Sequence, residues 1–300
     1  VISRYYGYHG GTFGAMAASG TGPRKSKFEP QMSGFVKVFP PNHFRDNFDT
    51  WEECNRFAAT MVEDTIIAED PETVAAVMVE PIGNTGGIIT PTPEYLALLR
   101  DICDRHSVIL IFDEVITGFG KTGSMFAAQT FGVTPDVICC GKGMSSGVIP
   151  IGAIAARRRI GEAFWGSEKD DLHFMHGHTY AGNPLAAAAA IAVIDTILEE
   201  ELLVRAGENG AHLRSRLERL EDTGVVREVR GKGSLLGVEL TNPQVGKAIA
   251  RRAVSDGIIL RTDPYWFAVA PALIATDDEI ETLCDQVEAT LSSAIVEANV

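Results

Sequence analysis

Short runs of apolar residues alternate along this chain with longer segments in which apolar residues recur at helical spacing. Residues 74–82 (VAAVMVEPI) and 108–115 (VILIFDEV) are two such runs, and their branched side chains are typical of strands buried on both faces of a sheet. Between them, residues 93–106 carry the spacing of an amphipathic helix. This order of strand, helix and strand predicts parallel strands joined by a right-handed crossover.

Further elements follow the same pattern. Residues 137–140 and 151–156 indicate two more short strands. Asn183 and Pro184 are followed by an alanine-rich run to Leu198, which predicts a helix with the proline near its first turn. The small side chains of this helix favour close packing over exposure to solvent.

The character of the chain changes after about Val204, where charged residues become frequent. We expect an α/β fold with two domains: a large one over 1–205, with a mostly parallel central sheet and helices on both faces, and a smaller C-terminal α+β domain over 206–300. In the smaller domain the pattern predicts a charged helix, a hairpin, a second helix, two short apolar runs and a last helix, at 206–220, 225–240, 245–255, 258–261, 267–270 and from Asp277.

Composition narrows the possible classes of protein. The 300 residues suffice for a sizeable core, and 45% of them are apolar. The 40 acidic residues outweigh 26 basic ones, and the resulting net charge of −14 argues against a protein that binds nucleic acid through its phosphates. Five cysteines, an odd number without a C-x-x-C pair, argue against a disulfide framework and indicate reduced thiols in the cytoplasm. No apolar run reaches the roughly 18 residues that span a membrane.

Two lysine motifs imitate a phosphate-binding P-loop without completing it. The motif at Lys121 (GKT) lacks the glycine required five positions earlier, where Val115 stands. The motif at Lys142 (GKG) lacks that glycine as well, and no Ser or Thr follows the lysine. His176 and His178 are half of a possible metal site, but no further ligand pattern accompanies them, so a loop turn is favoured and no metal is expected.

The strand expected at 108–115 contains two adjacent acidic residues, Asp113 and Glu114. An unpaired carboxylate at the end of a buried strand is costly, so such a residue needs a partner. One interpretation is that it caps the following helix. The other is that it points into the crevice at the carboxyl ends of parallel strands, where α/β proteins bind ligands. The pattern leaves both interpretations open.

Lys142 closely follows the strand expected at 137–140 and stands between two glycines. One interpretation is an exposed loop lysine. The other is a lysine whose pKa is lowered by apolar surroundings, which favours reaction of its amine with a carbonyl group. A lysine and an aspartate at strand ends meet the requirements of pyridoxal 5'-phosphate (PLP). The lysine holds the aldehyde as an imine, and the aspartate keeps the pyridine nitrogen protonated so that the ring accepts electrons.

At these residues the sequence resembles a known family, the class III PLP-dependent aminotransferases of fold type I. Each motif alone is weak, but the combination is specific and extends over essentially the whole chain. The matching segments, in family order, are 6–15 (YGYHGGTFGA), 77–87 (VMVEPIGNTGG), 110–123 (LIFDEVITGFGKTG), 135–153 (PDVICCGKGMSSGVIPIGA), 176–190 (HGHTYAGNPLAAAAA) and 256–261 (DGIILR). The resemblance implies a fold type I PLP-transferase that moves amino groups.

The resemblance also implies roles for single residues. Lys142 would hold the cofactor and move a proton between the substrate and the cofactor. Asp113 would pair with the pyridine nitrogen, Val115 would press on one face of the ring, and Tyr8 would stack on the other. Without the resemblance, Tyr8 would be interpreted as an ordinary core aromatic residue.

Three further residues complete the cofactor site that the resemblance implies. His9 follows the stacking tyrosine, and Glu80 would belong to the polar network around the aspartate and the substrate. Thr179 would donate a hydrogen bond to the cofactor phosphate, and in this family it belongs to the neighbouring subunit. A homodimer with shared active sites is therefore expected.

Arg261, at the end of the apolar run 258–261, matches the family arginine that binds a substrate carboxylate, although the residue alone could equally be a surface arginine. In relatives that use ornithine or 4-aminobutyrate with 2-oxoglutarate, a glutamate after VEPIxG masks this arginine, whereas Thr85 stands there here. The chain thus resembles most the ω-amino acid:pyruvate subgroup, including the taurine–pyruvate aminotransferases. We expect an ω-amino acid or amine as donor, such as taurine or β-alanine, and a keto acid, pyruvate, as acceptor.

Alternatives to transamination remain at this point. A PLP-dependent aminomutase of the glutamate-1-semialdehyde type would need no external keto acid, a PLP decarboxylase would release CO₂, and an inactive relative would keep only the fold. Class III chains also have a segment ahead of the position of Val1, with a helix N-terminus that binds the cofactor phosphate. We therefore expect the 300-residue chain alone to bind PLP weakly or to misfold, and the longer protein that contains it to be a working transaminase.

Overall fold

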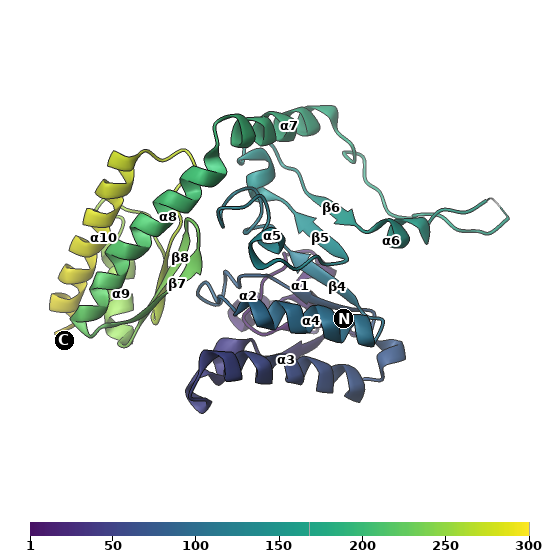
Figure 1. The fold of residues 1–300 in the computed structure, drawn as a ribbon, viewed down its shortest axis with the longest axis horizontal. Coiled ribbons are helices and arrows are strands. Elements are labelled where there is room, and N and C mark those ends of the chain that lie inside the picture. Colours follow the sequence, from purple (N-terminus) through teal and green to yellow (C-terminus); the bar gives the residue numbers. More distant parts are fainter. Residues whose placement is uncertain (168, 300) are drawn as a thin grey trace.

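The computed structural model describes residues 1–167 and 169–299 and contains two sheets (Figure 1). The strands of the larger sheet are β1 Ile2–Arg4, β2 Val36–Val38, β3 Ala76–Val79, β4 Ile109–Asp113, β5 Val137–Cys140 and β6 Ala153–Ala156. They lie in the order β2-β1-β3-β4-β5-β6; the first five run parallel, and β6 runs antiparallel to β5. The predicted mostly parallel sheet is confirmed, with one antiparallel strand at its edge.

The predicted unit of strand, helix and strand is confirmed as β3, α4 (Pro93–Arg105) and β4. Thr92 caps α4 because its hydroxyl accepts a hydrogen bond from the N–H of Tyr95 at 3.3 Å. Pro93 occupies the first turn, where its missing N–H costs nothing. These local signals explain why the start of this helix could be predicted to the residue.

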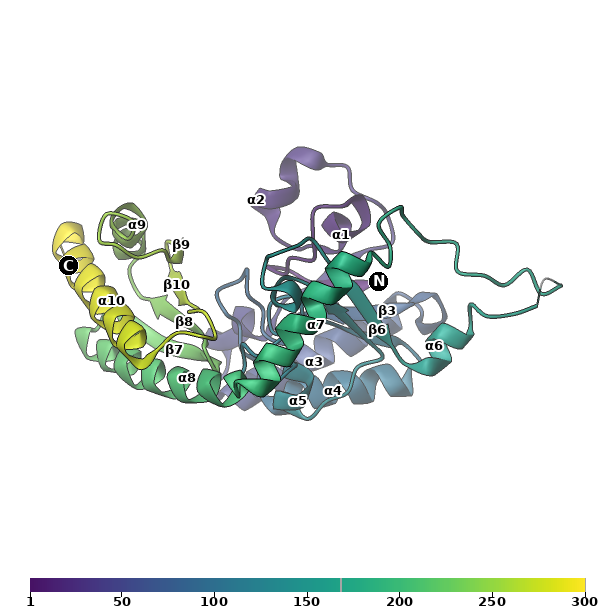
Figure 2. The ribbon, with the colours of Figure 1, turned by 90° about the horizontal axis from the view of Figure 1, so that it is seen from above.

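Helices lie on both sides of the larger sheet. α3 (Trp51–Ala68) and α4 pack side by side on one side of it, and the short helices α1 (Phe13–Ala18) and α2 (Gly22–Lys25) lie on the other (Figure 2). Leu99 from α4 and Phe112 from β4 are fully buried in the core between sheet and helices. Burying a side chain of this size contributes about 1.5–3 kcal/mol.

The smaller sheet is antiparallel, with strands in the order β7-β8-β10-β9, and three helices pack against it (Figure 1). Its elements are α8 Leu202–Glu218, β7 Val226–Lys232, β8 Leu235–Leu240, α9 Pro243–Arg252, β9 Arg261–Asp263, β10 Trp266–Val269 and α10 Asp277–Ala298. The predicted hairpin (β7 and β8) and the last helix (α10) are confirmed. The first helix starts at Leu202, earlier than the charged pattern indicated, because its first turn is apolar and packs against the larger part of the chain.

The remaining helices are α5 (Ala127–Phe131), α6 (Arg158–Glu162) and α7 (Pro184–Glu199). The predicted alanine-rich helix is confirmed as α7, and Asn183 caps it by accepting a hydrogen bond from the N–H of Leu185 at 2.9 Å. However, only a narrow strip of α7 is buried, and the strand β6 is exposed along its length, so the close packing expected of the alanine-rich face is not found within this chain. Among the residues that the structure describes, no helix is both long and apolar enough to cross a bilayer.

One buried carboxylate ties several elements of the larger sheet together. Asp136, directly before β5, accepts hydrogen bonds from the N–H of Leu110 in β4 at 2.9 Å, from Arg100 in α4 at 2.8 Å and from Arg159 in α6 at 2.7 Å. Burial alone would raise the pKa of Asp136, but these donors outweigh it and lower the pKa to about 2.

We expect Asp136→Asn to lower the free energy of unfolding at pH 7 by about 3 kcal/mol, because Arg100 and Arg159 would lose a fully buried anion. Since the pKa of Asp136 lies below its ordinary value of 3.8, its contribution is present above pH 4 and is lost as the pH falls toward 2. Urea unfolding of both proteins checks this: the gap between wild type and variant should shrink below pH 4. Asp101→Asn removes an exposed partner of Arg105 on the same helix as Arg100 and should cost less than about 1 kcal/mol. Equal losses in the two variants would contradict the prediction.

Candidate active site

The two acidic residues at the end of β4 have different partners. Glu114 is fully buried and accepts hydrogen bonds from the N–H groups of Ala127 and Ala128 at 2.6 and 2.8 Å, and from the hydroxyl of Thr117 at 2.9 Å. It therefore caps α5, and burial raises its pKa. Asp113 makes none of these contacts and turns to the other side of the strand. The two interpretations left open for this pair thus apply to one residue each.

Asp113 lies at the carboxyl end of the parallel strands and is held by two donors. One oxygen (Oδ2) is 2.8 Å from Nδ1 of His9, and the other (Oδ1) accepts the N–H of Val115 at 3.1 Å. The side chain of His9 is 1% exposed, and its other ring nitrogen, Nε2, is buried without a hydrogen-bond partner in the described part of the chain. Because a carboxylate only accepts, Nδ1 of His9 carries the proton, which fixes the orientation of both side chains.

Glu80, directly after β3, connects this carboxylate to the segment that contains Tyr8. Its two oxygens accept the N–H of Tyr8 at 3.0 Å and the N–H of Asn84 at 2.9 Å. Burial raises the pKa of Glu80, although His9 and the two N–H donors act against that effect. The predicted residues His9, Glu80 and Asp113 therefore lie in one network.

Lys142 begins a short 3₁₀ helix directly after Gly141, beyond the end of β5. Its φ of +43° lies in the left-handed region, which costs a lysine about 1–2 kcal/mol and is a mark of functional sites. Burial lowers its pKa, although the charges of Asp113 and Glu80 act in the opposite direction. An amine with a lowered pKa is more readily neutral and therefore nucleophilic.

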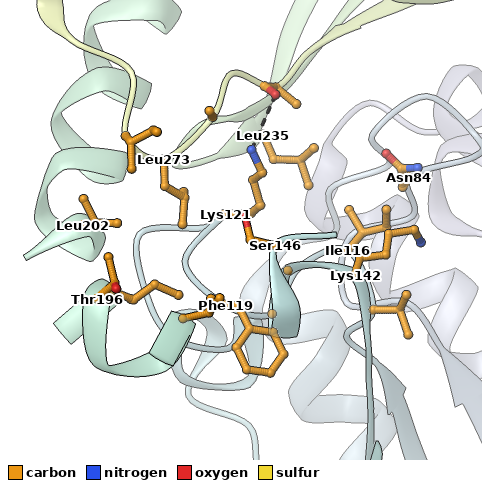
Figure 3. Close-up of a pocket in the computed structure, with 18 of the residues that line it drawn as sticks. Asn84, Ile116, Phe119, Lys121, Lys142, Ser146, Thr196, Leu202, Leu235 and Leu273 are labelled. Carbon is orange, nitrogen blue, oxygen red and sulfur yellow. Dashed lines mark hydrogen bonds between the residues drawn. The ribbon is translucent and has the colours of Figure 1, made fainter. Parts of the chain in front are cut away.

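Lys142 lines a largely apolar cavity of about 500 Å³ between the two sheets (Figure 3). Val115 lines the same cavity, as does a second lysine, Lys121. Burial lowers the pKa of Lys121 as well, but its amine donates to the backbone carbonyls of Ala270, at 3.5 Å, and Pro271. Figure 3 shows the two amines pointing in different directions. Of these two lysines, only Lys142 lies close enough to Asp113 for the charge of that aspartate to act on its pKa.

Tyr8 lies half-buried beside this network, and the guanidinium carbon of Arg24 is 4.8 Å from the centre of its ring. The charge of Arg24 is close enough to lower the pKa of both Lys142 and Arg261. No role was predicted for Arg24 from the sequence, because a single arginine in a short turn carries no pattern. The only sign of a role for Arg24 is its position beside Tyr8, and that position is seen only in the folded chain.

Arg261, the first residue of β9, reaches the same region from the smaller sheet. Its guanidinium carbon is 5.5 Å from the centre of the Trp266 ring, and it has no ion-pair partner among residues 1–167 and 169–299. Burial lowers its pKa first, and the charge of Arg24 lowers it further, whereas Glu80 and Asp263 raise it. Among the described residues Arg261 therefore pairs with no carboxylate, and its role in binding a substrate carboxylate remains a prediction.

Thr179 does not join this cluster. It lies exposed in the long loop between α6 and α7, which extends away from the sheets in Figures 1 and 2. His176 and His178 belong to the same loop, and nowhere in the described residues do three or more His, Cys, Asp or Glu side chains gather as metal ligands do. Seven of the eight predicted residues therefore lie around one crevice, and Thr179 is separate from them.

The residues of the crevice fit PLP by their chemistry. An aldehyde needs an amine that is readily neutral, which Lys142 offers, and a protonated ring nitrogen needs a buried carboxylate held in place, which Asp113 offers through His9. Val115 lines the cavity beside Lys142, and Tyr8 supplies an aromatic ring near the same network; their positions on the two faces of a bound ring remain a prediction. Of the residues predicted from the sequence, only Thr179 was expected to donate a hydroxyl to the cofactor phosphate, and it lies outside the crevice.

A mostly parallel sheet with a lysine and a carboxylate at its carboxyl edge, joined to a smaller α+β part, defines a fold type I PLP-dependent transferase. The sequence model of the class-III aminotransferase family matches residues 1–291. The chain therefore belongs to the class III aminotransferases, a PLP-dependent family.

Relatives and solved structures agree with this assignment. The chain is 38% identical, over 94% of its length, to a probable aminotransferase of Mycobacterium tuberculosis, and 34% identical, over 97%, to an omega-aminotransferase of Caulobacter vibrioides. It is also similar to a thermostable (S)-enantioselective omega-transaminase from Thermomicrobium roseum, with a TM-score of 0.91 and 35% identity over 98% of the chain. The chain spans 64%, 68% and 67% of the lengths of these three proteins.

Proposed function

We propose that the protein containing this chain transfers an amino group from an ω-amino acid or amine to a keto acid, pyruvate. The observation that carries this proposal is the convergence of three groups from three elements: the amine of Lys142, the carboxylate of Asp113 and the unpaired guanidinium of Arg261. The relatives described above bear aminotransferase and transaminase names, which favours transfer over the aminomutase alternative.

Each residue has a task that follows from its surroundings. PLP, when bound, supplies a ring that accepts electrons from the substrate. Lys142 would hold the aldehyde of PLP through Nζ, and the same Nζ would accept a proton from the substrate carbon that bears the amine, because burial lowers its pKa and leaves more of the amine neutral. Asp113, oriented by His9, holds a proton on the ring nitrogen. Arg261 binds the substrate carboxylate with its planar pair of N–H donors.

We further propose a homodimer whose subunits share active sites, as the resemblance implies. The separation of Thr179 from the crevice supports this, since that threonine would then serve the neighbouring subunit. The exposed apolar side chains of Leu185, Ile191 and Leu198 on α7 support it as well, because a second copy would cover them.

Five unpaired cysteines support the expected cytoplasmic location.

The choice of acceptor tests the proposed function. With β-alanine or taurine as donor, the holoenzyme should use pyruvate at least about tenfold better than 2-oxoglutarate, measured as kcat/KM, because Thr85 stands where relatives that use 2-oxoglutarate have a glutamate that masks the arginine. Formation of alanine is the readout. A preference for 2-oxoglutarate would contradict the assignment of pyruvate, and conversion of the donor without any keto acid would indicate an aminomutase.

A further inference from the structure

The crevice around Lys142 holds more positive charge than one carboxylate needs. Besides Lys142 itself, Arg24 and Arg261 lie there without an ion-pair partner among the described residues. This contrasts with a net charge of −14 and with the many other arginines of the chain that do form ion pairs. The nearby carboxylates of Glu80 and Asp113 are already held by backbone N–H groups and by His9.

The two guanidinium groups are held in a similar way, each beside an aromatic ring. Arg24 comes from α2 and lies over the ring of Tyr8, and Arg261 comes from β9 and lies near the ring of Trp266. A cation on an aromatic face is held without using its N–H donors, which stay free for a ligand. Arg24 and Tyr8 also line one hollow of about 450 Å³. Each arginine is therefore positioned and still able to bind an anion.

Arg24 and Arg261 carry like charges, and an anion bound between them would relieve their repulsion. Arg24 lowers the pKa of Arg261 and of Lys142, so the ligand-free crevice carries an electrostatic cost that a bound acid group removes. A guanidinium meets a carboxylate or a sulfonate through two parallel hydrogen bonds, which gives geometric selectivity as well as affinity.

A transaminase for ω-amino acids has to recognise acid groups at two different positions. In pyruvate and alanine the carboxylate is bonded directly to the reacting carbon. In β-alanine or taurine one methylene separates the acid group from the carbon that bears the amine, so the acid lies about 1.5 Å or more further out. A single arginine held on Trp266 meets only one of these positions without moving.

We propose that Arg24 binds the remote acid group of an ω-amino donor, whereas Arg261 binds the carboxylate of the keto acid. This inference rests on the proposed function and names the donor class: amines that carry a carboxylate or sulfonate beyond the reacting carbon. Arg24 is then a residue that determines donor specificity.

The test compares acidic and neutral donors of matched shape in the holoenzyme. In Arg24→Gln we expect KM for β-alanine and taurine to rise at least about tenfold, because a charge-assisted pair of hydrogen bonds is lost. KM for β-alaninamide, which has the same amine and no acid, and KM for pyruvate should change less than about twofold. Arg261→Gln should show the reverse pattern and raise KM for pyruvate. Comparison of taurine with β-alanine shows which acid group fits better.

Lys27→Gln is the matched control, because it removes an exposed positive charge close to Arg24 in the chain but outside the hollow that Arg24 and Tyr8 line. It should leave every KM unchanged. Equal effects of Arg24→Gln on β-alanine and its amide, or equal effects of Lys27→Gln and Arg24→Gln, would overturn the inference while the proposed function stands. If the holoenzyme transaminated none of these donors, both the inference and the proposed function would be overturned.

Melting curves show whether Arg24→Gln is folded. Should it not fold, Arg24→Lys and the wild type decide the question. Arg24→Lys keeps the charge without the planar fork, so KM for β-alanine should rise by less than in a charge deletion but still more than KM for the amide. The wild-type ratio of kcat/KM for β-alanine over β-alaninamide should exceed about ten, and a ratio of one or below would overturn the inference.

Discussion

Lys142→Ala should abolish covalent binding of PLP and reduce transamination at least about 10³-fold, because the variant loses both the amine that binds the aldehyde and the base that moves the substrate proton. The holoenzyme should lose the visible absorbance of lysine-bound cofactor. After reduction with borohydride, mass spectrometry should find the cofactor mass on the peptide that contains Lys142 in the wild type and on no peptide of the variant.

Lys121→Ala is the control for this prediction. Both lysines line the same cavity, and burial lowers the pKa of both, so they differ mainly in their partners. The amine of Lys121 is engaged by the carbonyls of Ala270 and Pro271, and its loss should lower stability while the absorbance of lysine-bound PLP remains. Retention of that absorbance in Lys142→Ala would show that another lysine carries the cofactor.

Asp113→Asn should lower kcat by about 10²- to 10³-fold while PLP still binds, because the amide no longer provides the negative charge that keeps the ring nitrogen protonated. Steady-state kinetics with saturating PLP, together with the absorbance of the bound cofactor, distinguish loss of chemistry from loss of binding. The expected pattern is a holoenzyme that is loaded and slow.

Glu114→Gln, at the next position, is the control. It shows whether the loss of a carboxylate outside the crevice also slows the reaction. Since Glu114 caps α5 from the other side of β4, its variant should lose about 1–3 kcal/mol of stability and keep the kcat of the folded enzyme. If Glu114→Gln slowed the reaction as much as Asp113→Asn, the assignment of Asp113 to the cofactor would be wrong.

The sequence was informative wherever short-range signals decide the structure. The cap at Thr92, the apolar run of β4 and the acidic start of α10 each depend on neighbouring residues, and each element was found where it was predicted. The direction of β6 was not predictable, because antiparallel pairing at a sheet edge depends on the path of the loop before it. The boundary between domains near residue 205 remains a prediction.

The same distinction holds for the candidate site: residues marked by the local sequence could be predicted, and residues marked only by the fold could not. Lys142 and Asp113 stand out in the sequence because each follows an apolar strand, so their meeting at one edge of the sheet could be predicted. Whether Asp113 or Glu114 faced that edge depended on the pleat of β4, which sends neighbouring side chains to opposite sides. Arg24 was invisible, because its importance arises from Tyr8 and Arg261, which only the folded chain brings near it.

The hydrogen bonds of Asp136 affect the positions of the functional groups as well as the stability of the fold. This carboxylate joins β4 to the start of β5 at the amino edge of the sheet, whereas Asp113 and Lys142 project from the carboxyl edge of the same two strands. The spacing of the two functional groups is therefore set at the far side of the sheet by a residue that touches neither. A change at Asp136 or its arginines would therefore be transmitted through the two strands to Asp113 and Lys142, although it lies at the opposite edge of the sheet.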